Sequence, residues 1–195
     1  MARPDQKNQP ESYNFLEKSS FKFEIQKLPE LNYFVTKANL PGISGEGPNL
    51  PNRFTTFALV PDSASFEYLE VEFIIDEHLK NWIAIWDWIS NMTFTRDHSQ
   101  WLSLVNDPIS HNLSKNGDMG NLYSDGFLSI ITASKTPTPI TAKFHNMYPT
   151  SLSQINFDSH LTDATPQTAT VRFQYQVYTL ETPWRHQVGT KSEME

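Results

Sequence analysis

The stretch YLEVEFII, residues 68–75, decides the fold, because apolar and acidic side chains alternate along it. This period of two predicts a β-strand with one face in a core and the other face, carrying Glu70 and Glu72, in water. The strand runs directly into a segment with helical spacing. Asp76 is expected to cap that helix, because its side-chain oxygens can accept hydrogen bonds from the free N–H groups of the first turn.

The segment after Asp76 is the most convincing helix in the sequence. Its apolar residues recur at steps of three and four and predict one buried stripe, formed by Leu79, Trp82, Ile83, Trp86 and Ile89. The stripe is widened by Ile85, Trp88 and Met92, so we expect the helix to be buried on more than one side. The predicted anchors between the helix and the sheets are Leu79, Trp82, Trp86 and Ile89.

Further strands are predicted on both sides of this unit. Residues 21–25 (FKFEI) and residues 171–177 alternate strictly between apolar and polar side chains. Less regular apolar runs predict strands at 33–40, 127–132 and 140–147 and a sixth element at 153–157. Residues 41–66 are rich in proline and glycine and are expected to form a long loop or an irregular hairpin, with a short strand at 54–59.

This inventory predicts a mainly β fold, a two-sheet antiparallel β-sandwich or open barrel with one flanking α-helix. The 195 residues are enough for one domain of ordinary size. We expect this domain at residues 19–182, between an N-terminal arm (1–18) and a C-terminal tail (183–195). Residues 93–123 are polar without a clear period and predict a loop, with a short helix at 100–105.

Composition narrows the functional classes. The chain has 15 Lys and Arg against 22 Asp and Glu, a net charge of −7, which argues against binding to nucleic acid or to an anionic membrane. It has no cysteine, which excludes disulfides and cysteine-based zinc sites. No apolar run approaches the roughly 18 residues that a membrane-spanning helix needs, and the polar N-terminus does not resemble a secretory signal.

The sequence holds no recognisable catalytic motif. None of the six histidines has a second histidine three to five residues away, and phosphate-loop, dinucleotide-binding and serine-hydrolase motifs do not occur. Asp158 and His160, with Asp163, are more typical of a polar turn than of a metal site. We therefore predict no enzymatic activity, no metal and no cofactor. The carboxylates leave a glycoside hydrolase open as a weaker alternative.

Two tryptophans lie in polar surroundings, Trp101 and Trp184. Exposed tryptophans most often anchor protein interfaces. A carbohydrate-binding β-sandwich that stacks sugars on these rings is the alternative interpretation.

Four short motifs, in order, resemble the tail-tube fold of contractile-tailed bacteriophages. An FxFxI strand lies at Phe21–Ile25, an LPG turn at 40–42, an aromatic DW in the helix at 87–88, and a YPT block at 148–150. The resemblance covers about residues 20–180. Each motif is weak alone, and their order and spacing carry the similarity.

The resemblance implies a structural virion protein of the phage tail, made in the host cytoplasm. Six copies would form a ring in which one sheet from each copy joins an inner barrel, and DNA would pass through the lumen without specific binding. The implied partners are adjacent tube or baseplate rings, the sheath and the tape-measure protein. A tube-initiator ring of the baseplate hub and a tail terminator share this fold and remain open.

The residues expected to make contacts between subunits or rings come mainly from the 41–66 segment. They are Pro41, Gly42, Pro48, Pro51, Phe54, Trp101 and Trp184. We expect the segment itself to reach a neighbouring subunit or ring.

Overall fold

A computed structural model describes residues 15–93, 97, 99, 122–131, 140–158, 160 and 165–182. Its strands are β1 (Phe21–Ile25), β2 (Val35–Ala38), β3 (Ile43–Glu46), β4 (Asn49–Pro51), β5 (Thr56–Ala58), β6 (Ser63–Phe66), β7 (Leu69–Ile74), β8 (Ser124–Ile130), β9 (Ile140–Leu152), β10 (Thr168–Gln174) and β11 (Val177–Glu181). Its helices are the short 3₁₀ helix η1 (Leu31–Tyr33) and α1 (Lys80–Thr93). Trp101, Trp184, the predicted helix at 100–105 and the predicted tail lie outside the described residues.

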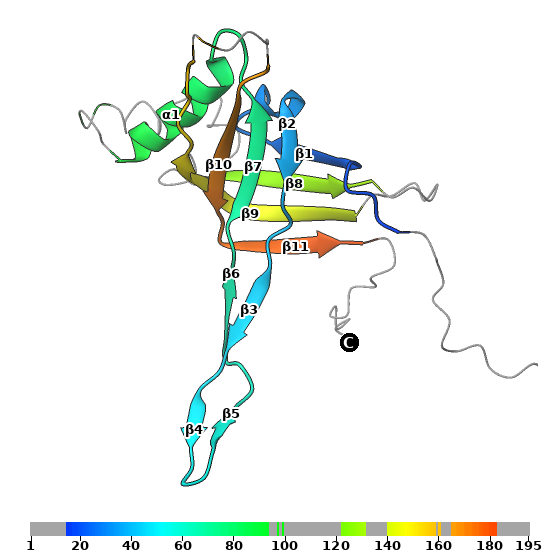
Figure 1. Ribbon diagram of the computed structural model, residues 1–195, viewed down its shortest axis with the longest axis vertical. Helices are drawn as coiled ribbons and strands as arrows, with labels where there is room; N and C mark the ends of the chain where they lie inside the picture. The colour runs from blue at the N-terminus through cyan, green and yellow to red at the C-terminus, as the bar shows by residue number, and fades with distance from the viewer. Residues whose placement is uncertain are drawn as a thin grey trace, which may run out of the picture.

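Two antiparallel sheets share one long strand (Figure 1). The first sheet has the order β1-β8-β9-β11 and contains the first half of β9. The second has the order β9-β10-β7-β2 and contains the last residues of β9. With α1 on one flank, this is the predicted sandwich or open barrel.

The chain turns from one sheet to the other at two adjacent corners. The strand predicted at 140–147 is longer than expected, because β9 continues through Pro149 to Leu152 after a bend at Asn146, whose φ is 52°. Pro149 is tolerated because, among the described residues, β10 is the only strand beside β9 there, so the missing N–H interrupts no second ladder.

The second corner divides the predicted strand 171–177. β10 ends at Gln174 in the second sheet, and β11 begins at Val177 in the first. The Asn146 amide donates to Oε1 of Gln176 over 2.7 Å, which ties the two corners together. The predicted element at 153–157 is not a strand, although Ser153 donates its N–H to the Thr170 carbonyl at 2.9 Å.

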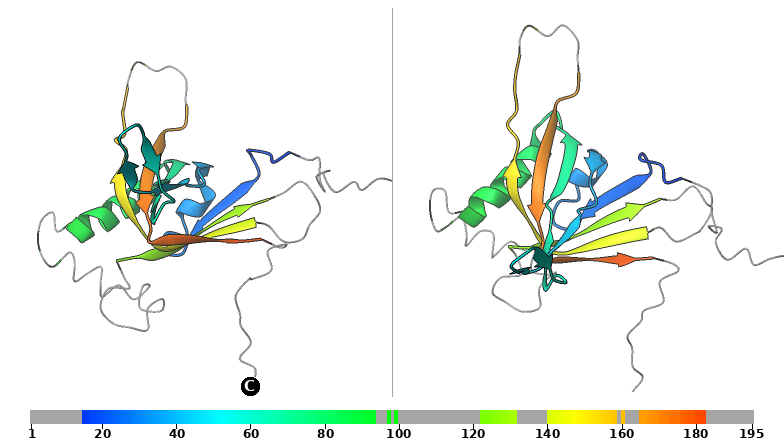
Figure 2. Two further views of the ribbon diagram at one scale, coloured as in Figure 1. Left: turned by 90° about the horizontal axis from the view of Figure 1, so that it is seen from below. Right: turned by 60° about the horizontal axis from the view of Figure 1, so that its bottom comes forward.

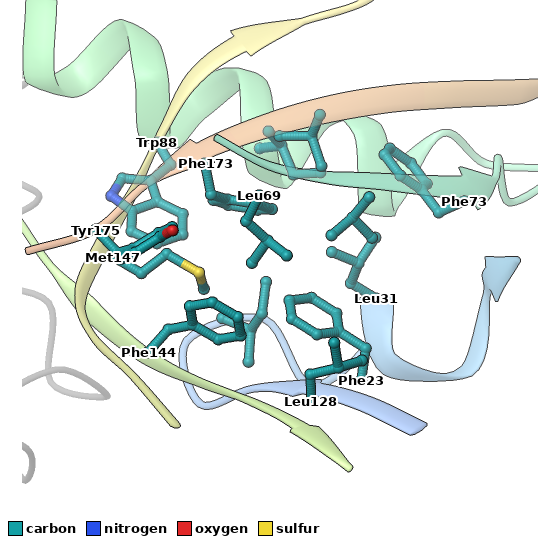
Figure 3. Close-up of a cluster of buried hydrophobic side chains, with 14 of the residues drawn as sticks. Phe23, Leu31, Leu69, Phe73, Trp88, Leu128, Phe144, Met147, Phe173 and Tyr175 are labelled. Carbon is teal, nitrogen blue, oxygen red and sulfur yellow. The ribbon is translucent and has the colours of Figure 1, made fainter. Parts of the chain in front are cut away.

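The core lies between the two sheets and α1. Four phenylalanines from four strands meet there, almost fully buried: Phe23, Phe73, Phe144 and Phe173. Figure 3 shows these rings converging with Leu69, Met147 and Trp88. Burial of each such side chain stabilises the fold by about 1.5–3 kcal/mol relative to exposure, so the alternating strands are held mainly by this apolar layer.

The buried face of the helix overlaps the predicted stripe but is centred on the residues that were expected only to widen it. Ile85 and Trp88 are buried, whereas Trp86 is 41% exposed and is not a core anchor. The predicted anchors Trp82 and Ile89 are half-buried against the core. Leu79 precedes the helix, with a φ of 58°.

Hydrogen bonds from the indoles help to orient this face. Trp88 donates its ring N–H to the Leu122 carbonyl at 3.0 Å, and its ring lies 6.3 Å from that of Phe173. Trp82 donates its ring N–H to the Ser153 carbonyl at 3.3 Å. Because apolar residues surround most of the helix, the sequence pattern alone did not distinguish the buried face.

A buried asparagine organises the junction between β7 and α1. The Asn81 amide donates to the Ile74 carbonyl at 2.8 Å, and its Oδ1 accepts from the N–H groups of Asp76 and Trp82 at 3.2 and 2.8 Å. Asp76 was predicted to cap the helix with its side chain. Instead, α1 begins at Lys80, and Asn81 satisfies backbone groups on both sides of the turn.

Candidate assembly surfaces

The 41–66 segment forms a long hairpin that projects away from the two sheets (Figures 1 and 2). β3 pairs with β6 and β4 pairs with β5, so the irregular hairpin of the sequence prediction is present. The two ladders are separated at Gly47, where a Cβ atom would lie 2.5 Å from the Leu59 carbonyl oxygen. Only glycine fits this close approach between the hairpin arms.

The hairpin exposes an unusual amount of apolar surface. Its exposed large side chains are Ile43, Leu50, Phe54, Phe57, Leu59, Val60 and Phe66, and Phe54 at the tip is 88% exposed. Except for Phe66 at the base, these residues have no second layer to pack against, because the hairpin is only two strands wide. Large apolar side chains exposed together on one projecting segment are typical of a protein interaction site.

An aromatic cluster holds the base of the hairpin against the corner between the sheets. The ring of Phe66 lies 6.0 Å from that of Tyr175 and 5.6 Å from that of Tyr178. The Tyr175 hydroxyl donates to the Glu67 carbonyl at 2.9 Å, and the Tyr178 hydroxyl donates to the Pro41 carbonyl at 3.1 Å. Both ends of the hairpin are therefore bonded to the body.

The same cluster changes the acidity of Tyr175. Burial of the phenol, reinforced by Tyr178 and Glu67 nearby, raises its pKa from 10.0 to about 12. The hydroxyl thus stays protonated, and stays a donor to the hairpin base, across the physiological range.

The first sheet ends in two open edges, β1 and β11. Each strand has five residues and a single strand partner, β8 or β9, among the described residues. Asn32 covers one end of the β1 edge, where its Oδ1 accepts from the Ile25 N–H at 2.9 Å. Open edges of this kind can add a strand from another chain.

The outer face of the first sheet pairs its basic side chains with acids. Lys22 forms an ion pair with Glu24, a contact that raises the pKa of the lysine. The Nζ atom of Lys143 lies 2.7 Å from Oε1 of Glu181 on the neighbouring strand β11. Strands β1, β8, β9 and β11 carry two lysines, Lys22 and Lys143, and both are paired with a glutamate. Paired in this way, they offer a phosphate backbone little free positive charge.

The predicted contact residues fall on different parts of the hairpin. Pro41 is buried at the base, and Gly42 is exposed beside it. The Pro48 carbonyl accepts from the Leu59 N–H at 3.1 Å, Pro51 ends β4, and Phe54 stands at the tip. Sequence analysis missed the tyrosines of the hairpin base, because their partners are more than 100 residues away along the chain.

The described residues hold neither a candidate metal site nor a helix that could span a membrane. Within these ranges no group of three or more His, Cys, Asp or Glu side chains is placed to hold a metal ion. Searched over the same residues, no helix is long and apolar enough to cross a membrane. The surfaces that stand out in the described residues are the exposed hairpin and the open sheet edges, which suit assembly.

Comparisons with known proteins give a family match and several structural matches. A model of the family described as phage tail tube protein matches residues 6–181. No curated protein matches the sequence. Among solved structures, the tube-terminating cap of the anti-feeding prophage is similar, with a TM-score of 0.58 and 13% identity over 92% of this chain and 99% of that chain.

Two chains from an extracellular contractile injection system are also similar. One is from the PVC sheath/tube terminator, with a TM-score of 0.52 and 11% identity over 89% of this chain and 100% of that chain. The other is from the PVC sheath–tube complex, with a TM-score of 0.52 and 12% identity over 87% of this chain and 93% of that chain. At these identities the likeness shows a shared fold.

Proposed function

The chain belongs to the phage tail tube protein family, and we propose that six copies of it close into a ring that stacks with others into the tube of a contractile tail. The single observation that carries this proposal is the pair of open edges on the first sheet. The family membership makes the chain a tail tube or tube-related structural protein, and the ring is our extension of it.

Strand direction supports closure through β1 and β11. Each strand of the first sheet is antiparallel to the next, so β11 runs opposite to β1. A neighbour related by rotation about a common axis would place its β1 beside β11 with the antiparallel direction retained. Copies joined in this way form a head-to-tail ring that closes if the rotation fits.

Such a ring would be hollow. A barrel made from the four-stranded sheets of several copies exceeds the small barrels whose interiors side chains can fill. Its lumen would be lined by the outer face of the first sheet, where Lys22 and Lys143 are paired with carboxylates. We propose that DNA passes over this lining without being retained, because few cations are free to bind phosphate.

Cysteine cross-linking tests the ring directly, since the chain has no cysteine of its own. The double variant Lys22→Cys/Thr179→Cys places one thiol on β1 and one on β11, both on the outer face. We expect oxidation to give a ladder of covalent species that ends at six copies on a denaturing gel. The control is the double variant Thr36→Cys/Thr179→Cys, in which the first thiol lies on β2 of the second sheet. It should give no ladder.

Native mass spectrometry and electron micrographs of the unmodified chain provide the independent measure. A ring mass of six copies is expected, and a monomer at all concentrations would overturn the proposal.

The role of an end ring is a second candidate, because the similar structures include a tube-terminating cap. The number of copies per particle separates the two roles. Hundreds of copies indicate the tube shaft, whereas six indicate a terminator or an initiator ring at the baseplate.

A further inference from the structure

The open edge of β1 is partly blocked by a side chain of its own chain. Asn32 in η1 accepts the Ile25 N–H with its Oδ1 at 2.9 Å. Successive residues of an antiparallel strand direct their backbone groups alternately to the two sides. The Gln26 N–H donates to a β8 carbonyl at 3.2 Å, so the even-numbered residues of β1 face β8. The odd-numbered residues face the open edge, where Phe21 and Phe23 keep both backbone groups available and Ile25 has lost its donor.

β11 offers a matching row of backbone groups at the opposite margin of the first sheet (Figure 1). The same alternation, carried through β8 and β9, directs the odd-numbered residues of β9 toward β11. The His145 carbonyl agrees with this direction, because it accepts from the N–H of Gln176, directly before β11, at 3.0 Å. Within β11 the odd-numbered residues therefore face β9, and Tyr178 and Leu180 direct their N–H and C=O groups to the open edge.

The faces of the two strands limit how they can meet. Lys22 and Glu24 on β1 lie on the outer face of the sheet, as does Thr179 on β11. Side chains of one face must meet across a continuous sheet, because a slip of one residue turns every side chain to the other face. An odd-numbered residue of β1 must therefore lie opposite an even-numbered residue of β11. The directions of the free backbone groups impose the same condition, so the allowed registers differ by steps of two residues.

We infer that β11 of one copy pairs with β1 of the next with Phe23 opposite Tyr178 and Phe21 opposite Leu180, and that Asn32 fixes this register. All four paired residues have backbone groups at an open edge. Their side chains lie on the core face, where Phe23 is buried and the other three are half-buried, so the junction extends the apolar layer from one copy to the next. The inference rests on the proposed ring and names the side chain that sets the offset between its copies.

The neighbouring registers each meet an obstacle. A shift by two residues places Ile25 opposite Tyr178, a pairing that needs the N–H group that Asn32 already holds. A shift by four places Glu24 opposite Glu181, and like charges directly opposite each other destabilise a sheet. A shift by two in the other direction leaves one of the two free residues of β1 beyond the end of β11.

The offset is important because every junction of the ring repeats it. A shift by two residues displaces one strand along the other by about 7 Å. In a closed barrel, strand tilt and diameter depend on the stagger summed over all strands. Asn32 thus acts as a stop at the β1 edge, and through the register it sets the width of the ring.

Disulfide trapping distinguishes the registers, because the chain has no cysteine of its own. In the inferred register, Lys22→Cys lies opposite Thr179→Cys in a non-hydrogen-bonded pair, where Cα atoms are about 4.5 Å apart and a disulfide can form. In the register shifted by two residues, Glu24→Cys lies opposite Thr179→Cys instead. We expect the first double variant to give roughly tenfold more covalent ladder on a denaturing gel than the second, which is its matched control on the same strand.

Variants of Asn32 test its role in the register. Asn32→Ala releases the Ile25 N–H, so the ratio of the first ladder to the second should fall roughly fivefold, the effect of about one hydrogen bond. Asn32→Asp keeps an acceptor oxygen at the same place and should leave the ratio unchanged.

The outcomes separate the register from the ring. Rings of six copies that favour the cross-link between positions 24 and 179, or a ratio that does not respond to Asn32→Ala, would overturn the register and leave the ring proposal standing. An unmodified chain that stays monomeric in native mass spectrometry at all concentrations overturns the ring, and the register with it.

Discussion

The body and the hairpin use similar residues in opposite ways. Phe144 and Phe173 in the body are buried completely between the sheets, whereas Phe54 and Phe57 in the hairpin are exposed. Each body strand packs one apolar face against a second layer, and the two-stranded hairpin has no second layer to cover it. The comparison shows that the body contains its own core, whereas the apolar side chains of the hairpin stay exposed in the single chain.

Truncation of a body phenylalanine is the largest expected effect. Phe173→Ala removes a ring that packs on Trp88, and we expect a loss of about 3–5 kcal/mol in the free energy of unfolding, because a cavity remains in a close-packed layer. Urea unfolding followed by tryptophan fluorescence measures it. A loss below about 1 kcal/mol would mean that the body is not the self-contained core described above.

Removal of the junction amide should have the next largest effect. Asn81→Ala leaves the Ile74 carbonyl and the N–H groups of Asp76 and Trp82 without their partner, so we expect a loss of about 1–3 kcal/mol. Asn49→Ala in the hairpin is the matched control, and its effect should lie within the error of urea unfolding. If the two variants were equally stable, Asn81 would have no special role.

The hydroxyl at the hairpin base is expected to contribute less. Tyr175→Phe removes the bond to the Glu67 carbonyl and should destabilise the body by about 0.5–1.5 kcal/mol at neutral pH. Tyr68→Phe, an exposed tyrosine, serves as the control.

Tyr175 should also make stability depend on pH in the alkaline range. Its folded pKa is about 12 against an ordinary 10.0, so the folded chain retains a proton that the unfolded chain has released. The stability contributed by this group is therefore complete below pH 10 and is lost as the pH rises toward 12. Denaturant midpoints at several alkaline pH values should show a shallower decline in Tyr175→Phe than in the unmodified chain. Parallel declines would contradict the assignment.

Truncation at the hairpin tip gives the smallest expected change in stability. Phe54→Ala should alter the free energy of unfolding of the isolated chain by no more than about 0.5 kcal/mol, because an exposed side chain has few contacts to lose. Its effect should instead fall on assembly, as shorter tubes in micrographs. A destabilisation as large as that of Phe173→Ala would remove the contrast between body and hairpin.

Much of the body was predictable because a strand between a core and water has a period of two. The prediction placed β1 at its observed bounds and β7 within one residue at each end, and it assigned their buried faces correctly. The family resemblance was predictable from motif order and is confirmed. The contacts between rings and subunits stay predictions, because they lie outside a single chain.

Three features escaped prediction for identifiable reasons. The strand predicted at 140–147 stopped before Pro149, because a missing N–H usually ends a ladder, but β9 has a single partner there among the described residues. Trp86 was expected among the core anchors of α1 but is exposed, because apolar residues occupy nearly every side of the helix and their spacing does not say which side is covered. The hairpin base depends on Tyr175 and Tyr178, whose partners are distant in sequence.

By itself, the sequence determined where strands with one wet and one dry face form, since alternation along 21–25 and 69–75 is a local property. Only the tertiary structure decided which other apolar residues are buried. Phe144 and Phe54 are chemically alike, but Phe144 faces a second sheet and Phe54 faces open solvent at the end of a hairpin. The physical reason is that burial depends on what lies opposite a side chain, and that is set by strand pairing over long sequence distances.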